Sequence, residues 1–353
     1  MHIIAEAGVN HNGSPELAAE LATVSAAAGA DVVKFQTFQT SKLVTGRAAR
    51  ADYQSRNIGS GSQADMLAAL ELPLAVFVSL AEHCRKAGIA FLSTPFDEDS
   101  ARFLVEELGC DTIKIGSGDL LNLPLVMQIG RSGAHAILST GMASLGDVEL
   151  ALGAFAWGMS GRSDLPTRSL DLIDAYADVD HAELRRRATL LHCTTEYPAP
   201  PESINLKAVQ TLRAAFGLET GFSDHSEGDW AALAACALGA TVLEKHITLD
   251  RTMEGPDHRA SMEPGPFKEM VARIRLLQSA LGDGRKRAVA AERANRPIAE
   301  KRVLAARDLP AGHVVRLEDV ALKRSADGAR ASMLFDILGR ALPEATARDD
   351  GIG

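Results

Sequence analysis

The stretches GFSDHS (residues 221–226) and LEKH (residues 243–246) each carry an apolar run into a histidine. Continuous apolar runs of this kind are typical of parallel strands that are buried on both faces. The carboxyl ends of neighbouring parallel strands meet at one edge of a sheet, so we expect His225 and His246 at a common rim. Two imidazoles there can hold a divalent metal with positions left open for a substrate. The alternative interpretation is that each histidine is a hydrogen-bonded core residue.

Six further apolar runs precede these two along the chain, and helical patterns separate nearly all of them. They occupy residues 2–7, 30–37, 89–97, 111–119, 135–142 and 188–198. Eight buried strands alternating with helices predict an α/β fold, most simply a (β/α)8 TIM barrel, in which active sites lie beyond the carboxyl ends of the strands. A doubly wound open sheet is the alternative, but the chain has no G-x-G-x-x-G turn to support it.

The chain is long enough for one large domain and a small one. We expect a barrel over residues 1–284, a linker over 285–300 and a small β-rich domain over 301–353, frayed from about residue 348. Residues 41–62 are expected to form a long loop over the strand ends. Residues 158–187 are expected to be a polar insertion with some helix.

Composition narrows the class of protein. The 353 residues carry a net charge of −9 with no long basic run, which argues against nucleic acid as a partner. The four cysteines are widely spaced, without C-x-x-C, as in proteins of a reducing compartment. No signal peptide or membrane-spanning stretch is evident, so we expect a cytoplasmic protein.

Two lysines, Lys34 and Lys114, sit among the apolar residues of predicted strands. With nearby hydroxyl groups they could bind a phosphate and a carboxylate. Alternatively, one lysine forms a Schiff base, or both are core residues paired with carboxylates. The hydroxyl groups in question belong to Thr94, Ser117, Ser139 and Ser223.

Two acidic residues are also candidates. Glu6 ends the first predicted strand and is either a general acid/base with a raised pKa or the ion-pair partner of Lys34 or Lys114. Asp257 lies in a loop with two prolines after the eighth strand, which either closes over the site or is a rigid connector.

Nine motifs in order along the chain resemble the sialic acid synthase family, the N-acetylneuraminate synthases and the related legionaminate and pseudaminate synthases. They are IIAEAGVNHNG, VVKFQTF, FLSTPFD, KIGSGD, ILSTGM, LLHCTTEYPAP, GFSDHS, LEKHITLD and GPDHRASMEP. The resemblance covers residues 1 to about 284. The tail, VLAARDLPAGHVV to LKRSADG, looks like that family's C-terminal antifreeze-like (SAF) domain.

The resemblance implies an enzyme that condenses phosphoenolpyruvate with an open-chain N-acetylated amino sugar, giving a nine-carbon 2-keto acid and phosphate. It implies a divalent metal, commonly manganese and alternatively magnesium, on His225 and His246. By motif, the phosphate would contact Lys34, Lys114, Ser139 and Ser223, and the carboxylate Thr94 and Ser117. Glu6 would be the acid/base group, and the sugar would contact Gln36, Tyr197 and Asp257.

The family is also a domain-swapped homodimer in which a tail arginine, here Arg324, reaches the partner's sugar. The tail reads Lys-Arg-Ser-Ala where the family usually has a proline and a glycine. Two further substrate-binding positions, Thr195 and Asp119, stand where sialate-forming members often carry Asn and Glu. The stretch HCTTEYPAP, together with YQSRN (residues 53–57) and GPDHRAS, makes the chain more similar to legionaminate-type members. The sugar is thus N-acetylmannosamine or a 2,4-diacetamido-6-deoxymannose.

Three other functions stay open on the sequence. A synthase for a phosphorylated sugar predicts an extra arginine cluster, which the strand-end motifs lack. A Schiff-base pyruvate aldolase predicts trapping of a lysine by borohydride. A catalytically inactive carbohydrate-binding homologue predicts sugar binding without phosphate release.

Overall fold

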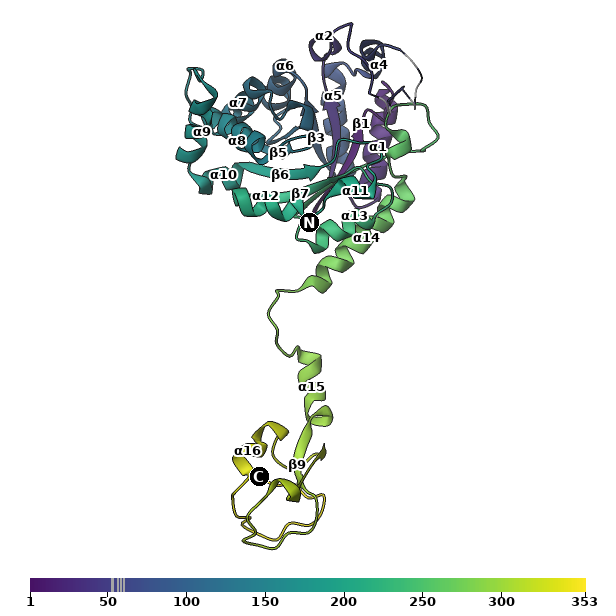
Figure 1. The fold of residues 1–353 in the computed structure, drawn as a ribbon. Helices are drawn as coiled ribbons and strands as arrows, with labels where there is room; N and C mark the ends of the chain where they lie inside the picture. Colours follow the sequence, from purple (N-terminus) through teal and green to yellow (C-terminus); the bar gives the residue numbers. More distant parts are fainter. Residues whose placement is uncertain (52–53, 56, 58, 60) are drawn as a thin grey trace. The chain divides into compact units, whose positions relative to one another are not determined.

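The computed structural model describes residues 1–51, 54–55, 57, 59 and 61–353, and the chain divides into two units, Met1–Gly282 and Asp283–Gly353 (Figure 1). Tyr53 and Arg56 of the YQSRN motif lie outside the described residues. Within the described residues, no single helix is long and apolar enough to cross a membrane.

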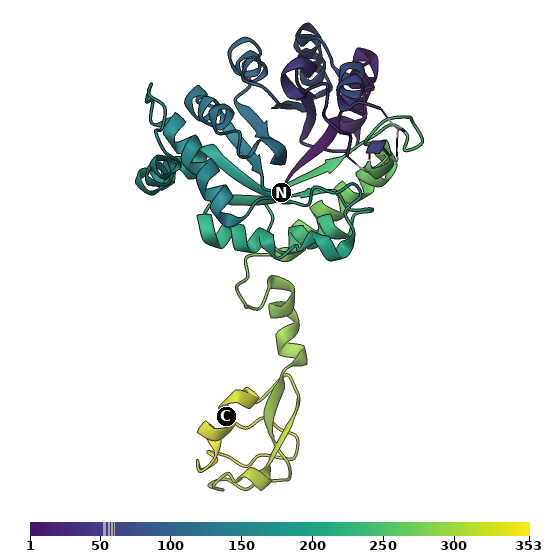
Figure 2. The same cartoon turned by 45° about the horizontal axis from the view of Figure 1, so that its top comes forward.

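The first unit is a nearly closed parallel barrel, which confirms the predicted fold class for this part of the chain. Its strands follow the order β3-β2-β1-β8-β7-β6-β5-β4, and the two end strands, β3 and β4, lie side by side. Helices surround the strands (Figure 2). The strands are β1 (His2–Gly8), β2 (Val32–Thr37), β3 (Ala90–Pro95), β4 (Thr112–Ile115), β5 (His135–Ser139), β6 (Ala188–Cys193), β7 (Glu219–Asp224) and β8 (Val242–His246).

Helices connect these strands, and several begin at a residue whose side chain caps the first turn. Ser14 accepts a hydrogen bond from the backbone of Leu17, with Pro15 at the first helical position. The insertion at residues 158–187 folds mainly into α9 and α10. The helices of this unit are α1 (Pro15–Ala27), α2 (Thr40–Leu43), α4 (Gln63–Leu70), α5 (Leu74–Ala87), α6 (Glu98–Arg102), α7 (Leu123–Ser132), α8 (Leu145–Met159), α9 (Ser169–Asp178), α10 (His181–Arg187), α11 (Pro201–Ile204), α12 (Ala208–Phe216), α13 (Trp230–Ala237) and α14 (Pro264–Leu281).

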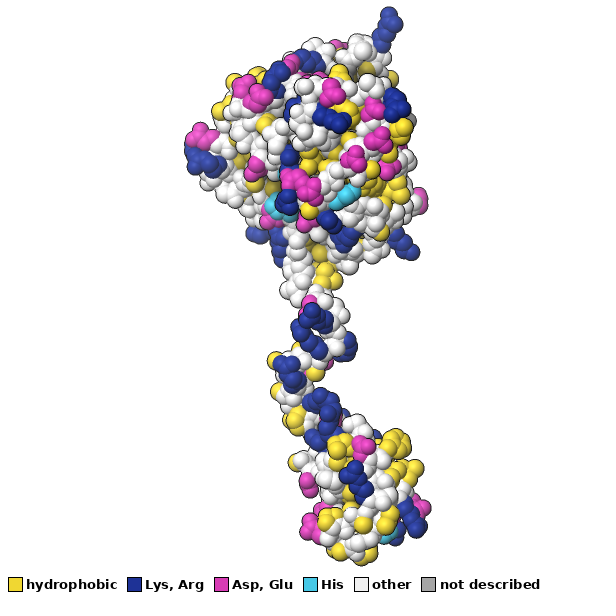
Figure 3. Space-filling model, turned by 90° about the vertical axis from the view of Figure 1, so that its left-hand side faces the viewer, with side chains coloured by type: hydrophobic (Ala, Val, Ile, Leu, Met, Phe, Trp, Pro, Cys, Tyr) yellow, Lys and Arg dark blue, Asp and Glu magenta, His cyan; other side chains and the backbone are white. Residues whose placement is uncertain are grey.

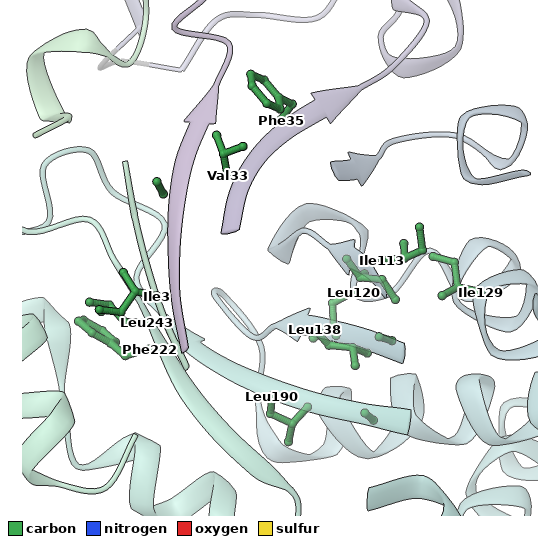
Figure 4. Packing of buried hydrophobic residues seen from close by; sticks show 14 of the residues in the cluster. Ile3, Val33, Phe35, Ile113, Leu120, Ile129, Leu138, Leu190, Phe222 and Leu243 are labelled. Carbon is green, nitrogen blue, oxygen red and sulfur yellow. The ribbon is translucent and has the colours of Figure 1, made fainter. Parts of the chain in front are cut away.

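The strands bury two apolar layers. Outward side chains such as Val33, Leu138 and Phe222 pack between the sheet and the helices (Figure 4). Inward side chains nearer the amino ends of the strands form a second cluster, which we call the lower layer. It consists of Ile4, Val32, Leu92, Ile137, Leu191 and Val242. Because side chains alternate along a strand, the next inward position lies two residues further on. On these strands this next inward position, nearer the carboxyl ends, forms an upper layer. It is occupied by Glu6, Lys34, Thr94, Ser139, Cys193 and Glu244.

The second unit is small. Its antiparallel hairpin pairs β9 (Lys301–Ala305) with β10 (Val320–Arg324), and its core includes Val303 and Ile337. Two helices, α15 (Ala290–Ala299) and α16 (Leu334–Ile337), accompany the hairpin. The segment expected to be a linker therefore contains a helix, and Figure 3 shows Lys and Arg side chains gathered around it.

The expectation of a frayed C-terminus was wrong. Ile352 is buried in the core of the second unit, and its backbone N–H donates to the carbonyl of Val303. Further backbone hydrogen bonds join Asp349 and Asp350 to Ala305 of β9, so the last residues are held by both apolar burial and backbone pairing.

Candidate active site

Polar inward side chains at the carboxyl ends of the strands line a cavity of about 350 Å³. Loop residues such as Gln54 and Pro256 complete its wall. The predicted site residues that line it are Glu6, Lys34, Gln36, Thr94, Lys114, Ser117, Ser139, Thr195, Tyr197, Ser223, His225, His246 and Asp257. Most sequence-predicted candidates thus come together in one place.

Glu6 and Lys34 form a buried ion pair, with 2.9 Å between Oε2 and Nζ. Lys34 also donates to Thr94 Oγ1 at 3.0 Å, and the Gln36 amide donates to Glu6 Oε1 at 3.2 Å. Burial raises the pKa of Glu6 to about 7, although the charge of Lys34 opposes the shift. A carboxyl group with this pKa can both accept and donate a proton near neutral pH. Both sequence interpretations of Glu6, as an acid/base group and as an ion-pair partner, are therefore compatible with the structure.

Glu244 lies between the two lysines, and the sequence analysis did not select it. Its Oε1 atom is 3.7 Å from Lys34 Nζ and 3.8 Å from Lys114 Nζ. Burial alone would raise the pKa of this carboxyl, but the two lysine charges outweigh it and lower the pKa to about 2. The signal that could have identified Glu244 is its place two residues before His246, which puts both side chains on the inner face.

Lys114 contacts one of the predicted hydroxyl groups, that of Ser139. Its Nζ donates to Ser139 Oγ at 2.6 Å, and burial lowers its pKa. Ser117 Oγ lies 3.0 Å from Cys193 Sγ and accepts from the Gly141 backbone at 3.0 Å. A methyl group on Gly141 would lie 2.4 to 2.8 Å from Thr195 Oγ1, Cys193 Sγ and Ser117 Oγ, so any larger residue there would displace these side chains.

His225 and His246 face each other, with ring centroids 5.5 Å apart. His225 Nδ1 lies 2.6 Å from the carbonyl of Thr194, which can only accept, so Nδ1 carries the proton and Nε2 keeps its lone pair. Burial lowers the pKa of His225 to about 4 and that of His246 well below its usual value, so both rings are neutral at pH 7.

This pair fits a metal site that is open on the substrate side. An ion about 2.1 Å from one nitrogen of each ring would place the ring centroids roughly 4.5–6 Å apart. The bond from His225 Nδ1 to a backbone carbonyl is the usual way to orient a metal-binding imidazole. No cluster of three or more His, Cys, Asp or Glu that could hold a metal occurs among the described residues, so the remaining positions would belong to solvent or substrate.

Tyr197 and Asp257 form another part of the wall. The Tyr197 ring centroid is 4.1 Å from that of His225 and 5.6 Å from that of His246. Burial raises the pKa of Asp257 to about 6. Its loop is held from two sides, because Asn57 donates to the carbonyl of Pro256 and Asn12 to that of Glu254.

The remaining predicted residues are Asp119 and Arg324. Asp119 lies in the 3₁₀ turn Ser117–Asp119, accepts a hydrogen bond from Asn122, and does not belong to the described cavity lining. Arg324 is at the end of β10 in the second unit, where it is exposed.

Comparison with known proteins gives a consistent result. The NeuB family model matches residues 21–286. This chain belongs to the sialic acid synthase (NeuB) family. It is 43% identical over 339 residues to the N,N'-diacetyllegionaminic acid synthase of Campylobacter jejuni, covering 96% of this chain and 94% of the relative. The enzyme of the same name from Legionella pneumophila is 39% identical over 341 residues, covering 96% and 90%.

A solved structure agrees. The N-acetylneuraminic acid (sialic acid) synthetase from Leptospira borgpetersenii, in complex with citrate, superimposes with a TM-score of 0.66 at 31% identity. The match covers 83% of this chain and 89% of that chain. All three of these relatives are named as synthases or synthetases of nonulosonic acids. This chain is therefore an enzyme of nonulosonic acid synthesis.

Proposed function

We propose that the enzyme condenses phosphoenolpyruvate with the open-chain form of an N-acetylated amino sugar, giving a nine-carbon 2-keto acid and inorganic phosphate. The observation that carries this proposal is the placement of two buried lysines in the same cavity as two facing, neutral imidazoles. The lysines suit an anionic substrate, and the imidazoles suit a metal that activates an aldehyde.

The lysine side of the cavity would bind phosphoenolpyruvate. Lys34, Lys114, Ser139 and Ser223 would contact the phosphate, while Thr94 and Ser117 would contact the carboxylate. The charge balance supports this assignment, because Glu244 is ionised whereas the pKa of Glu6 is raised to about 7. Near pH 7, where Glu6 is about half ionised, two cations face about one and a half compensating carboxylates, which leaves net positive charge for the anion.

The imidazole side would bind a divalent cation, Mn²⁺ or Mg²⁺, through His225 and His246. When bound, the ion supplies Lewis-acid polarisation of the aldehyde oxygen. The amino sugar would lie against Gln36, Tyr197 and Asp257, with Thr195 as a further contact implied by the family resemblance. Asp119, which the resemblance also implies, does not belong to the described cavity lining. The C3 enol carbon of phosphoenolpyruvate would then attack the aldehyde carbon.

Glu6 would handle the protons. As the enol attacks, protonated Glu6 donates its proton to the aldehyde oxygen, which becomes a hydroxyl group. The attack leaves a cationic centre at C2 of phosphoenolpyruvate, to which water adds. Glu6 accepts the proton of that water, and collapse of the tetrahedral intermediate breaks the bond from C2 to the bridging oxygen and releases phosphate. The raised pKa of Glu6 supports this role, because a base poised near neutral pH transfers protons efficiently in both directions.

The sugar is proposed to be a 2,4-diacetamido-6-deoxymannose, with N-acetylmannosamine as the alternative. Support comes from the two relatives named N,N'-diacetyllegionaminic acid synthase, at 43% and 39% identity. Thr195, where sialate-forming members often carry Asn, points the same way.

The second unit is proposed to be the family's SAF domain, and the active form a homodimer with swapped SAF domains. The antiparallel hairpin of β9 and β10 supports the domain assignment. Arg324 of one subunit would then reach the sugar of its partner. Arg324→Ala should raise KM for the sugar far more than KM for phosphoenolpyruvate; an equal rise in both would contradict this role.

Phosphate release tests the function directly. Reactions with phosphoenolpyruvate and Mn²⁺ would contain the diacetamido sugar, N-acetylmannosamine or no sugar, each with and without excess chelator. We expect sugar-dependent release that chelator abolishes, faster with the diacetamido sugar. No release with either sugar from folded, metal-loaded protein would refute the synthase and favour the carbohydrate-binding alternative.

One observation favours a second candidate, the Schiff-base pyruvate aldolase. Burial lowers the pKa of Lys114, and such a lysine is a better nucleophile. Borohydride reduction in the presence of pyruvate separates the two functions. The aldolase predicts a covalent adduct on Lys114 and indifference to chelator, whereas the synthase predicts no adduct.

A further inference from the structure

Asp224 and Lys245 are charged residues in a layer that is otherwise largely apolar. Figure 4 shows outward side chains of neighbouring strands, among them Phe222 and Leu243, packed together. Asp224 and Lys245 are the next outward positions on the same two strands, and their side chains are 0% and 2% exposed. Lys245 Nζ lies 3.0 Å from Asp224 Oδ2.

The pair joins the last paired residues of β7 and β8. Asp224 is opposite Lys245 in the register of the two strands. Asp224 Oδ1 also accepts from Ser226 N at 2.8 Å and Ser226 Oγ at 2.7 Å, while Lys245 Nζ donates to the Ser226 carbonyl at 2.5 Å. The two charges therefore hold β7, β8 and the first residues of the following loop together.

The two imidazoles are the immediate neighbours of this pair. His225 stands between Asp224 and Ser226, and His246 follows Lys245. Because successive side chains point to opposite faces, the pair lies on the outer side of the strands and the imidazoles on the inner side. Lower in the barrel, Gly221 has no room for a Cβ, which would lie 2.3 Å from the carbonyl of Val242. Glycine at position 221 therefore lets β7 and β8 approach closely lower in the barrel. The ion pair joins the same two strands at the rim.

Stability alone does not account for a buried ion pair here. Desolvation of two charges offsets most of their attraction, so well-packed apolar residues often stabilise a protein as much or more. What the pair offers beyond an apolar contact is direction, because its hydrogen bonds define where Ser226 and both strand ends lie.

We propose that Asp224 and Lys245 are positioning residues that hold His225 and His246 at the separation needed to bind one divalent cation. Neither side chain touches the substrate. This inference rests on the metal site of the proposed function.

The test is Mn²⁺ affinity of the full-length protein without substrates, measured by electron paramagnetic resonance titration, alongside the thermal midpoint. The variant D224N/K245M removes both charges and, with them, the hydrogen bond from Lys245 Nζ to the carbonyl of Ser226. The matched control is T37V/S93A, which removes another buried polar pair, with 2.7 Å between its hydroxyl oxygens, from β2 and β3. These strands carry no imidazole that lines the cavity.

We expect D224N/K245M to melt near the parent temperature and to bind Mn²⁺ about 10–100-fold more weakly, as for the loss of other groups that orient metal ligands. T37V/S93A should keep the parent affinity. Equal affinity of D224N/K245M and the parent, or equal loss in both double variants, would overturn the inference. A parent protein that binds no Mn²⁺ would refute the metal site itself, and the positioning role with it.

If D224N/K245M does not fold, a milder variant, Ser226→Ala, provides the test. Ser226→Ala removes only the hydroxyl donor to Asp224 and keeps both charges. It should weaken Mn²⁺ binding at least about twofold, because one hydrogen bond from a neutral donor to a charged acceptor contributes a modest free energy. Unchanged affinity in Ser226→Ala would overturn the inference.

Discussion

The lower and upper inward layers of the barrel come from the same strands but do different work. Ile4, Val32 and Val242 belong to the lower, apolar cluster. Two residues further along those strands stand Glu6, Lys34 and Glu244, which are equally buried but ionisable. Burial therefore does not separate core from site in this protein. The difference lies in which side chains the strand places at its carboxyl end, where a cavity receives them.

This comparison explains how perturbed pKa values arise here. The lower layer excludes water beneath the cavity, and the upper layer places opposite charges within a few ångströms of one another. Burial then raises the pKa of Glu6 to about 7, whereas two lysines lower that of Glu244 to about 2. Neighbouring carboxyl groups whose pKa values differ this strongly are typical of functional sites.

The largest expected effect is loss of activity when the upper layer is altered. Glu6→Gln keeps the shape of the side chain but cannot exchange a proton, so phosphate release should fall about 10²–10⁴-fold. The parent should show a limb near pH 7 in its profile of kcat/KM, and the variant should lack it. Retention of the limb in Glu6→Gln would assign it to another group.

Stability of the same variant should move in the opposite direction. The folded pKa of Glu6 lies above its usual value of 4.5, so ionised Glu6 costs folding free energy that grows as pH rises from 4.5 through about 7. Gln avoids this cost. The difference in thermal midpoint between variant and parent should therefore increase from pH 5 to pH 8, and a decrease would contradict the raised pKa.

Altering the lower layer should give the reverse pattern. Leu191→Ala deletes a fully buried side chain and should reduce the free energy of unfolding by about 2–5 kcal/mol. Turnover at a temperature where the variant is folded should stay within about threefold of the parent. Denaturant titration and phosphate release on one preparation would check both. A loss of turnover as large as that in Glu6→Gln would remove the distinction between the layers.

A smaller effect is expected at the side wall of the upper layer. The added methyl group of Gly141→Ala would crowd Ser117 Oγ and Thr195 Oγ1. Overpacking of this kind costs about 1–3 kcal/mol. We expect a rise in KM for both substrates, because Ser117 is assigned to the carboxylate of phosphoenolpyruvate and Thr195 to the sugar. Steady-state kinetics with each substrate varied in turn would show it, and a rise confined to the sugar would place the carboxylate elsewhere.

The smallest effect is expected at Asp119. Its carboxylate accepts from Asn122 and does not belong to the described cavity lining. Asp119→Ala should change KM for either substrate by less than about threefold, the range of most substitutions outside a site. A change above tenfold would show that the turn moves when substrate binds.

The sequence predicted the barrel well because its strands are continuous apolar runs and its helices begin at recognisable caps. It also predicted that His225 and His246 would meet, since both follow such runs. It missed the role of Glu244, which stands between an apolar residue and a lysine and is assigned to a face only by counting from His246. It could not foresee the Asp224–Lys245 pair, because contacts across strands depend on register.

Other differences also have physical reasons. Asp119, which the motif resemblance singles out, lies beyond the end of β4 at Ile115, in the 3₁₀ turn Ser117–Asp119, where its carboxylate accepts from Asn122. The expected linker contains α15 because its alanines and arginines favour helix despite the charge. The roles of the individual site residues stay predictions.

Mass spectrometry of the reaction product tests the central claim most directly. The protein, Mn²⁺ and phosphoenolpyruvate would be incubated with each amino sugar, with and without chelator. The account predicts a keto acid whose mass is the sum of the sugar and pyruvic acid, formed only without chelator and greatly reduced in Glu6→Gln. Phosphate released without any such product, or a product formed equally well by Glu6→Gln, would contradict it.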